Sequence, residues 1–344
     1  MSNRQAVIPE ATGAIVVRDV PTYVPGEGEI LVKNHITASI PLEAKLQKFA
    51  FMPLAYPADT GIAFAGTVEE VGPGVTRFKK GDRVAVARAM YLFGDSRTGA
   101  NQRLVIAKEP TAAHIGPDGD FAEAASAISN LATTVPAISI VAGLDRPSKS
   151  PNPANKDTKV LVYGGSSQLG RLTIQYLQQA GYTVITTSSP ANRDDVVALN
   201  PEYVTNHSAN PNEVTADLIA HGPYAVVFDA VSLPPTQAIL GPVMLENKKH
   251  GKTNVVLATG PAETAPEGVE FRFESFSVLL QMEEKNADVN KWFFEEYVPG
   301  VFDGTFKLAP TRLENVPGGL NAFQGILDRI LGVSGIKLVY NPWE

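Results

Sequence analysis

The sequence predicts an α/β protein of two domains: a β-rich first domain, then a domain built on a doubly wound parallel sheet. Three observations support this prediction. The chain has 344 residues, more than the roughly 100–200 residues of a typical domain. Its first third consists of short runs rich in β-branched residues, separated by Pro and Gly. From residue 159 onward, strands of almost continuous Val, Ile and Leu alternate with helical segments, which is typical of a parallel sheet covered on both faces.

The first part of the chain predicts five strands and then a helical region. The strands are expected at residues 14–20, 29–39, 64–72, 81–87 and 102–108. Apolar residues recur at helical spacing from 121 to 144, where Ala is abundant, so a pair of helices is expected there. The next segment, 145–158, is rich in Pro, Ser and Asn and predicts an exposed loop.

The second half predicts alternating strands and helices. Strands are expected at 159–163, 182–189, 203–205, 224–231 and 253–260, and helices at 170–181 and 192–200. The tail mixes turns with a helix at 318–333 and a strand at 336–342, so we expect it to return to the first domain. The predicted boundaries are 1–125 for the β-rich domain, 126–295 for the parallel-sheet domain and 296–344 for the returning segment.

The composition predicts a soluble protein that binds neither nucleic acid nor membrane. Hydrophobic residues make up 44% of the chain, and no run approaches the roughly 18 apolar residues of a membrane helix. The net charge of -7 repels phosphate polymers. Because the start lacks the pattern of a secretory signal and the chain has no cysteine, we expect a cytoplasmic location. We expect no zinc, because thiolates are absent and the five histidines are scattered.

A glycine-rich segment, "GGSSQLG" at residues 164–170, follows the first strand of the parallel-sheet domain. Gly165, Ser167 and Gly170 fall where a dinucleotide-binding fingerprint has its three glycines. The segment is either a cofactor site, in which amides and hydroxyls bind the pyrophosphate, or an ordinary strand-to-helix turn. A second strand at 182–189 completes a βαβ unit and favours the cofactor site. The expected cofactor contacts are Gly165, Ser166, Ser167, Gln168, Leu169 and Gly170.

The end of that second strand indicates which cofactor is used. Enzymes that use NAD place Asp or Glu there to bind the ribose 2′-hydroxyl, but this strand ends in Ser188 and Ser189, followed by Asn192 and Arg193. Hydroxyls and a guanidinium can bind a 2′-phosphate, so NADPH is expected over NADH. The same residues also fit the capped first turn of a helix. Asp229, at the carboxyl end of a later strand, is either a further cofactor contact or a turn aspartate.

Three separated segments, 61–86, 121–134 and 160–189, together resemble the medium-chain dehydrogenase/reductases, and within them the zinc-independent enoyl and quinone reductase branch. The insertion at 145–158 resembles fungal members, including enoyl reductases that act in trans on polyketide synthases. This resemblance implies a GroES-like catalytic domain, a Rossmann domain and hydride transfer from NADPH.

The resemblance also implies roles for single residues. The family segment A-x-N-P-x-D-x-K corresponds to residues 38–45, where Ile40 replaces the asparagine and Glu43 the aspartate. Lys45 is then the candidate for polarising the substrate or donating a proton, or else a surface lysine on a short helix. Thr134, with its neighbour Thr133, matches a nicotinamide-proximal position, or else packs between helices. Lys337 matches a lysine near the cofactor phosphates.

We therefore expect an NADPH-dependent reductase of an activated C=C bond, in an enoyl thioester or an enone, with action in trans on a fungal polyketide synthase as the more specific hypothesis. Quinone reduction, a cofactor-binding protein with a non-redox role, and a cleft used for isomerisation or cyclisation are the alternatives. Aromatic and Met residues in the loops 49–61 and 88–99 favour a hydrophobic or carrier-tethered acyl substrate, although they fit a protein core equally well. The protein is expected to be a monomer or a homodimer.

Overall fold

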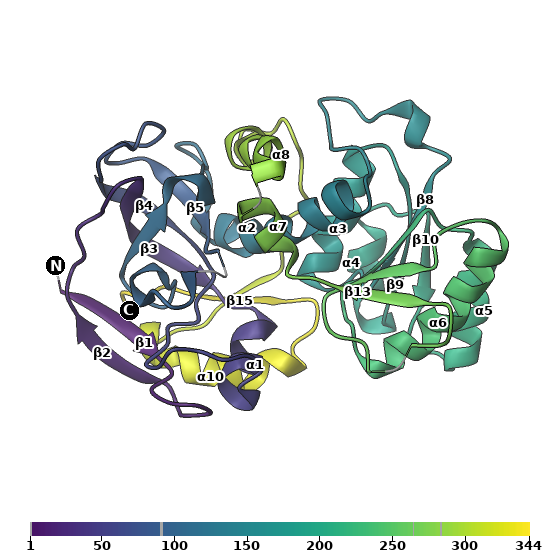
Figure 1. Cartoon of the computed structure of the whole chain (residues 1–344), viewed down its shortest axis with the longest axis horizontal. Helices are drawn as coiled ribbons and strands as arrows, with labels where there is room; N and C mark the ends of the chain where they lie inside the picture. The colour runs from purple at the N-terminus through teal and green to yellow at the C-terminus, as the bar shows by residue number, and fades with distance from the viewer. Residues whose placement is uncertain (1, 90–91, 264, 283) are drawn as a thin grey trace. The chain divides into compact units, whose positions relative to one another are not determined.

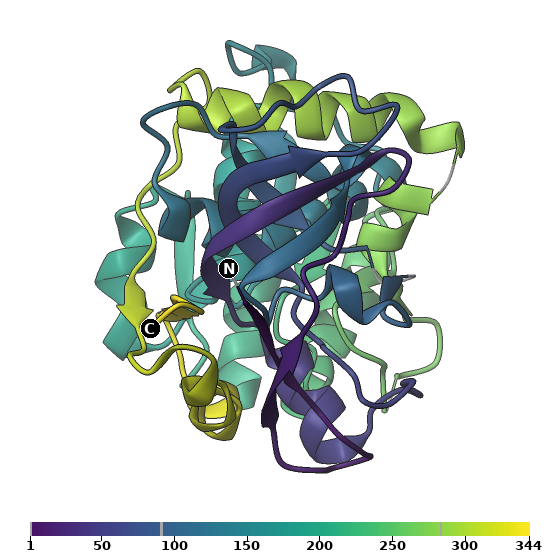
Figure 2. The same cartoon turned by 90° about the vertical axis from the view of Figure 1, so that its left-hand side faces the viewer.

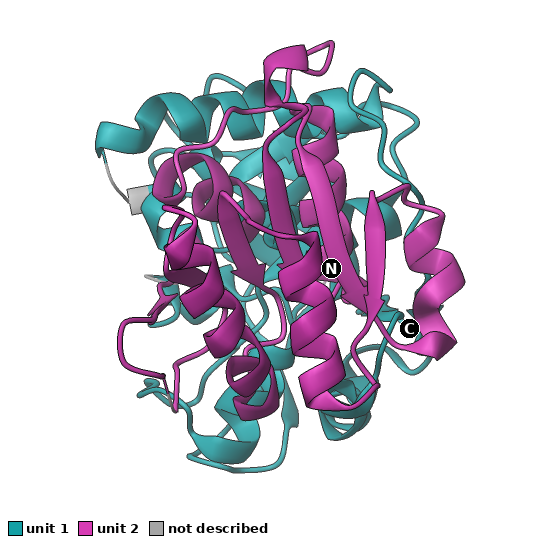
Figure 3. Ribbon diagram, turned by 90° about the vertical axis from the view of Figure 1, so that its right-hand side faces the viewer, with its two compact units in different colours: residues 1–132, 277–344 teal, residues 133–276 magenta. Residues whose placement is uncertain are grey.

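The chain forms two compact units in a computed structural model, which describes residues 2–89, 92–263, 265–282 and 284–344. Unit 1 comprises Met1–Ala132 and Ser277–Glu344, and unit 2 comprises Thr133–Phe276 (Figures 1 and 3). The second boundary lies 19 residues before the predicted one, because the segment after residue 276 packs within unit 1. There Gln281 Nε2 donates to the Ala87 carbonyl at 3.1 Å, and Phe293 and Phe294 are buried.

Unit 1 is organised around a seven-stranded sheet. Its strand order is β14-β15-β3-β4-β5-β7, with β6 also paired to β3, and every pair is antiparallel except β14 with β15. The bounds are β3 Glu29–Ala38, β4 Ala63–Val71, β5 Arg83–Ala87, β6 Leu104–Lys108, β7 Ala112–His114, β14 Leu313–Asn315 and β15 Lys337–Tyr340. A separate hairpin pairs β1, Asn3–Val7, with β2, Val16–Val20. Of these strands, β1, β7 and β14 were not predicted.

Five of the described helices belong to unit 1, apart from the first residue of α7, and two of them, α1 and α10, pack on the sheet through apolar side chains. Their bounds are α1 Pro41–Phe49, α7 Phe276–Met282, α8 Ala287–Trp292, α9 Val298–Phe302 and α10 Phe323–Arg329. Helix α10 lies beside helix α1 (Figures 1 and 2). Ala44 of α1 and Phe323 of α10 belong to one buried cluster with Leu338 and Tyr340 of β15.

Unit 2 contains the predicted parallel sheet, which confirms the fold class. Its order is β10-β9-β8-β11-β12-β13, and all five pairings are parallel. The bounds are β8 Lys159–Tyr163, β9 Thr183–Ser188, β10 Tyr203–Asn206, β11 Val226–Asp229, β12 Val255–Ala258 and β13 Glu270–Phe273. Helices α3 Gln168–Gln179, α4 Arg193–Val197, α5 Pro211–His221 and α6 Pro234–Lys249 cover it (Figure 3). The strand order reverses at β8, and open sheets of this kind bind ligands at that point.

Helix α2, Phe121–Val135, continues as a π-helical segment, Pro136–Val141. This run of 21 residues is long and apolar enough to cross a membrane by length and composition alone. However, 72% of its most apolar window is buried inside the structure, as in the core helix of a soluble protein.

Candidate functional site

The glycine-rich turn connects β8 to α3 at the point where the strand order reverses. Gly164 has φ of 90°, a conformation that favours glycine. A Cβ added at Gly165 would overlap the Thr186 hydroxyl, and one at Gly170 would overlap the Gly164 carbonyl oxygen. The glycines therefore allow the strand, the helix and β9 to approach one another closely, as the fingerprint requires.

Ser167, at the second fingerprint position, is the N-cap of helix α3. Its Oγ accepts a hydrogen bond from the Gly170 amide at 3.0 Å and donates to the Gly164 carbonyl at 2.8 Å. From the sequence, this hydroxyl was expected to donate to a phosphate, but in the structure its proton is used within the turn. Anion binding is then left to the positive end of helix α3, because a helix N-terminus favours anions, although its Gly170 amide is already bound by Ser167.

Thr187 links this turn to the ends of β9 and β10. Its Oγ1 accepts from the Gly164 amide at 2.9 Å and lies 3.3 Å from His207 Nδ1, while its carbonyl accepts from the Gly165 amide at 2.9 Å. The His207 ring stacks with Tyr163 at a centroid distance of 6.0 Å, and burial lowers the pKa of the histidine. Thr187, His207 and Tyr163 were not predicted as site residues, although their position at or just after the ends of predicted strands was a usable signal.

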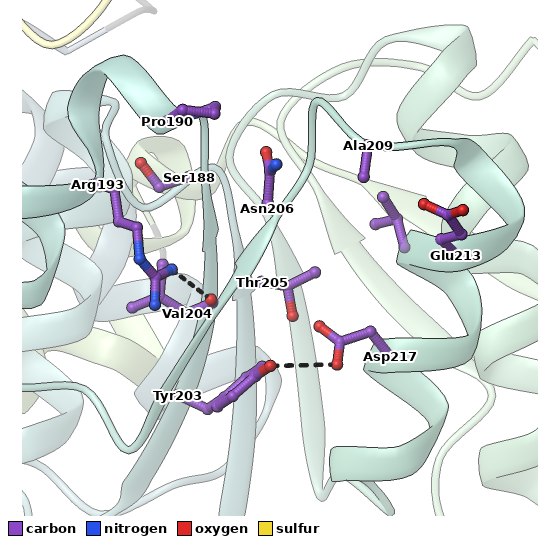
Figure 4. Close-up of a pocket in the computed structure, with 11 residues that line it drawn as sticks. Ser188, Pro190, Arg193, Tyr203, Val204, Thr205, Asn206, Ala209, Glu213 and Asp217 are labelled. Atoms are coloured by element: carbon purple, nitrogen blue, oxygen red, sulfur yellow. Dashed lines mark hydrogen bonds between the residues drawn. The ribbon is translucent and has the colours of Figure 1, made fainter.

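The segment after β9 lines a pocket of about 490 Å³ (Figure 4). Ser188 and Arg193 lie on one side of it, and Arg193 Nη1 donates to the Val204 carbonyl at 2.7 Å. Ser189 is held by Asn192, whose Nδ2 donates to the Ser189 hydroxyl at 3.3 Å. The residues predicted to bind a 2′-phosphate thus cluster beside the glycine-rich turn.

The opposite side of the pocket is acidic. Glu213 and Asp217 of helix α5 lie there, away from Arg193, and Tyr203 donates to Asp217 Oδ1 at 3.3 Å (Figure 4). A phosphate would be repelled by these carboxylates. An anion therefore fits only the side of the pocket that Ser188 and Arg193 form.

Asp229 does not face a ligand. Its side chain is buried, with Oδ1 accepting from the Val231 and Ser232 amides at 2.9 Å each and Oδ2 from the Thr236 hydroxyl at 2.7 Å. The residue is 0% exposed, and burial raises the pKa of its carboxyl. These contacts agree with the alternative interpretation, in which Asp229 is a turn aspartate. Its carboxylate holds the loop between β11 and α6.

Thr134 is buried in unit 2 rather than open to a ligand. Its hydroxyl lies 2.8 Å from that of Thr173 on helix α3, and Thr173 in turn donates to the Leu169 carbonyl at 2.9 Å. These contacts agree with helix packing, the alternative interpretation of this residue. Through Thr173, Thr134 supports the first turn of α3.

The two candidate lysines lie in unit 1, whereas the glycine-rich turn lies in unit 2. Lys45 is half-buried on α1, with Nζ 6.0 Å from the centre of the exposed Phe51 ring. Lys337 begins β15 and is buried, and Glu43 is the charged group acting on it. The structure brings together the expected contacts at 165–170 and 188–193, and it places Lys337 in a different unit from them.

The proposed substrate loops are partly core. In the loop 49–61, Leu54 packs against the buried cluster of Leu46, Ile62 and Phe93. In the loop 88–99, Phe93 belongs to that cluster, while Met90 and Tyr91 lie outside the described residues. Arg88 organises this second loop by donating to the Leu92 and Asp95 carbonyls. Among the described residues, no group of three or more His, Cys, Asp or Glu is arranged to hold a metal ion.

Known proteins resemble the chain over its whole length. Residues 26–137 match the family model of the alcohol dehydrogenase GroES-like domain. The zinc-binding alcohol dehydrogenase domain-containing protein cipB of Emericella nidulans is 32% identical over 330 residues, which cover 94% of this chain and 92% of cipB. The trans-enoyl reductase himH of Aspergillus japonicus is 31% identical over 316 residues, covering 90% and 89%. The solved structure of mycobacterial Rv1454c with NADPH shares the fold, with a TM-score of 0.74 and 18% identity over 99% of this chain and 100% of that one.

Proposed function

The chain belongs to the medium-chain dehydrogenase/reductase family, and we propose that it is an NADPH-dependent, zinc-independent reductase of an activated C=C bond in an α,β-unsaturated thioester or ketone. The observation that carries this proposal is the position of Ser188 and Arg193, which lie on one side of a pocket and directly follow Thr187, the residue that binds the glycine-rich turn. A relative 31% identical over 90% of the chain is a trans-enoyl reductase, which supports the same reaction.

The residues present fit the proposed cofactor. The first amides of α3 suit the pyrophosphate, because a helix N-terminus favours anions. Ser189 and Arg193 suit a 2′-phosphate, and the end of β9 carries no carboxylate to repel it. The buried Ser188 hydroxyl donates to the Ser189 carbonyl at 3.0 Å, so it shapes this segment rather than donating to a ligand. When bound, NADPH supplies the hydride that is added to the β-carbon of the substrate.

The chain itself supplies charge stabilisation and a proton. Negative charge develops on the carbonyl oxygen as the double bond is reduced, and fixed donors aimed at that oxygen lower the barrier. Lys45 carries an ammonium on the helix that begins directly after β3 and is our candidate for this stabilisation or for protonating the α-carbon. A side chain at a family catalytic position and half-open to its surroundings suits either task.

The proposed substrate and partner are based on the names of the relatives and on the apolar residues of the loops 49–61 and 88–99. We propose a hydrophobic acyl chain, free or tethered to a carrier, with a fungal polyketide synthase as the partner that presents it, acting in the cytoplasm. Trans-enoyl reductases among the relatives support this choice. The enzyme is expected to be a monomer or a homodimer.

The first test is a calorimetric titration with NADPH and NADH, followed by NADPH oxidation with a short α,β-unsaturated acyl thioester and with a quinone. Tighter binding of NADPH and faster turnover of the thioester are expected. Faster quinone reduction would replace the enoyl substrate by a quinone, while cofactor binding without turnover would favour a non-redox role. In an active enzyme, Lys45→Ala should lower kcat, whereas Lys48→Ala, on the same helix but in an exposed ion pair with Asp328, should not.

A further inference from the structure

Glu43 is a buried carboxylate at the start of helix α1. It is 0% exposed, and its Oε2 accepts from the Ile40 amide at 2.7 Å. Ile40, the N-cap residue, has no side-chain acceptor of its own, so Glu43 is the side chain that closes the first turn from inside. The position of this turn therefore depends on what holds Glu43.

Asn101 connects Glu43 to the sheet. Its Nδ2 lies 3.5 Å from Glu43 Oε1 as donor, and its Oδ1 accepts from the Tyr340 hydroxyl of β15 at 2.7 Å. The Asn101 amide lies 3.3 Å from Asp59 Oδ1, and its carbonyl accepts from the Ala6 amide of β1 at 2.8 Å. Tyr340, Asn101 and Glu43 thus form a continuous polar chain from β15 to the start of α1.

The charges around Glu43 come from several elements. Lys337, three residues before Tyr340, is only 6% exposed, and the structure gives its ammonium no hydrogen bond within the described residues. Burial raises the pKa of Glu43 to about 8 and lowers that of Lys337 to about 8, while each charge favours the other. Asp59, Tyr340 and Arg88 also act electrostatically within this cluster.

Helix α1 transmits this arrangement to Lys45. Ala44 and Leu46, on either side of Lys45 in the sequence, are both 0% exposed. They belong to different buried clusters, Ala44 to that of α10 and β15 and Leu46 to that of Ile62 and Phe93. The side chain of Lys45 therefore follows the position of the helix backbone, which these two packed neighbours and the Glu43–Ile40 hydrogen bond of the first turn together hold.

We propose that Glu43 is a positioning residue, which sets the direction of the Lys45 ammonium through the Tyr340–Asn101–Glu43 chain of hydrogen bonds. The inference rests on the proposed reductase function for its consequence in catalysis. The inference also makes a structural claim, namely that the surroundings of Lys45 depend on Glu43. This claim can be measured without enzyme activity.

The test compares Glu43→Gln and Tyr340→Phe with wild type and with Lys48→Met, a control that breaks the exposed Lys48–Asp328 pair on the same helix. Two readouts need no turnover: the rate at which an amine reagent labels Lys45, followed by mass spectrometry, and hydrogen exchange of the Ile40 amide. Both are expected to change in Glu43→Gln and, to a smaller degree, in Tyr340→Phe. In the kinetic arm kcat should fall up to about 100-fold while KM stays within about twofold, since a misplacement of 1 Å can cost this much.

Two outcomes would overturn the inference: a folded Glu43→Gln and a folded Tyr340→Phe that both label and exchange as wild type does, or a Lys48→Met that changes as much as they do. If Glu43→Gln does not fold, Tyr340→Phe alone decides, because it leaves α1 unchanged. A wild-type enzyme inactive on every acceptor would refute the proposed function, whereas the labelling and exchange results would still decide the positioning role.

Discussion

At the scale of single residues, Ser167 shows how a hydroxyl can occupy a fingerprint glycine position. Because its Oγ caps α3 and its proton goes to Gly164, Ser167→Ala should lower the free energy of unfolding by about 1 kcal/mol. The affinity for NADPH should change by less than about twofold, since the amides that face the anion remain. Urea unfolding and calorimetry measure the two effects.

Ser167→Gly is the matched control and should lower the free energy of unfolding by only about a few tenths of a kcal/mol. A large loss of NADPH affinity in Ser167→Ala at unchanged stability would instead mean that the hydroxyl binds the cofactor.

Arg193 separates the two nicotinamide cofactors. Its guanidinium is the positive group on the Ser188 side of the pocket, so Arg193→Ala should weaken NADPH binding by about 10-fold to 100-fold, the value of a charge-assisted hydrogen bond or two. NADH lacks the 2′-phosphate, and its binding should stay unchanged, which makes it the internal control in the same titration. Equal losses for both cofactors would show that Arg193 supports the fold through Val204 rather than reading the phosphate.

Residue roles were the least predictable part of the site. The glycine-rich turn and the serines after β9 could be found in the sequence, because spacing along one βαβ unit fixes where they lie. The buried hydrogen bonds of Asp229 and Thr134 could not be predicted from the sequence. Their partners lie seven and 39 residues away along the chain, and only the fold brings them into contact. An aspartate at the carboxyl end of a strand suggests a ligand contact, but the loop after the strand can form hydrogen bonds with the same side chain instead.

At the scale of elements, helix α1 ends in a strained residue. Ala50, its C-cap, has φ of 45° and ψ of 45°, a left-handed conformation that costs a residue with a Cβ about 1 kcal/mol or more. Ala50→Gly should therefore raise the free energy of unfolding by about 1 kcal/mol, less the greater freedom of glycine in the unfolded chain. Urea unfolding measures this, with Ala44→Gly as the control: that buried residue lies inside α1, and the change should destabilise. A destabilising Ala50→Gly would mean that the helix end does not hold this conformation.

Most strands with several buried apolar residues were predicted, including β11 and β12 with only four residues each. The strands β3, β5, β6, β8 and β9 lie within predicted runs, and β4 begins one residue before its predicted run. Strand β13, Glu270–Phe273, has four residues, two of them exposed, and its pairing with β12 rather than its composition makes it a strand. Strand β7 has only three residues and depends in the same way on β5.

At the scale of the whole molecule, tertiary contacts determine where the units divide. Composition placed the second boundary near residue 295, whereas the structure divides at Phe276 and Ser277. The helices that follow contain polar and charged residues, so their sequence does not indicate a partner. Buried aromatic contacts, such as Phe293 with Tyr297, and the hydrogen bond from Arg77 to the Phe294 carbonyl assign them to unit 1.

Buried ionisable groups give the whole molecule an unusual dependence on pH. Glu43 has a pKa of about 8 in the folded state, so the folded state holds a proton that the unfolded state has lost, and stability falls as pH rises toward 8. Lys337, with a folded pKa of about 8, acts in the opposite sense: above pH 8 the unfolded state holds the extra proton, and stability rises again. The lowered pKa values of His35 and His207 make stability rise with pH around and below the ordinary histidine value of about 6.5 and so oppose the effect of Glu43 there. Asp59, with a pKa of about 6, is mostly deprotonated above that pH.

The free energy of unfolding should therefore pass through a minimum near pH 8. Between about pH 6.5 and 7.5 it should fall, with an initial slope of up to about 1.4 kcal/mol per pH unit, the value for one proton. Urea unfolding at constant ionic strength and at about pH 6.5, 7.5 and 9 measures the curve. In Glu43→Gln the fall should vanish while the rise above pH 8 remains, because Lys337 still titrates alone. A wild-type stability that increases steadily over this range would show that Glu43 stays ionised in the folded protein, and that Lys337 compensates its charge more strongly than burial opposes it.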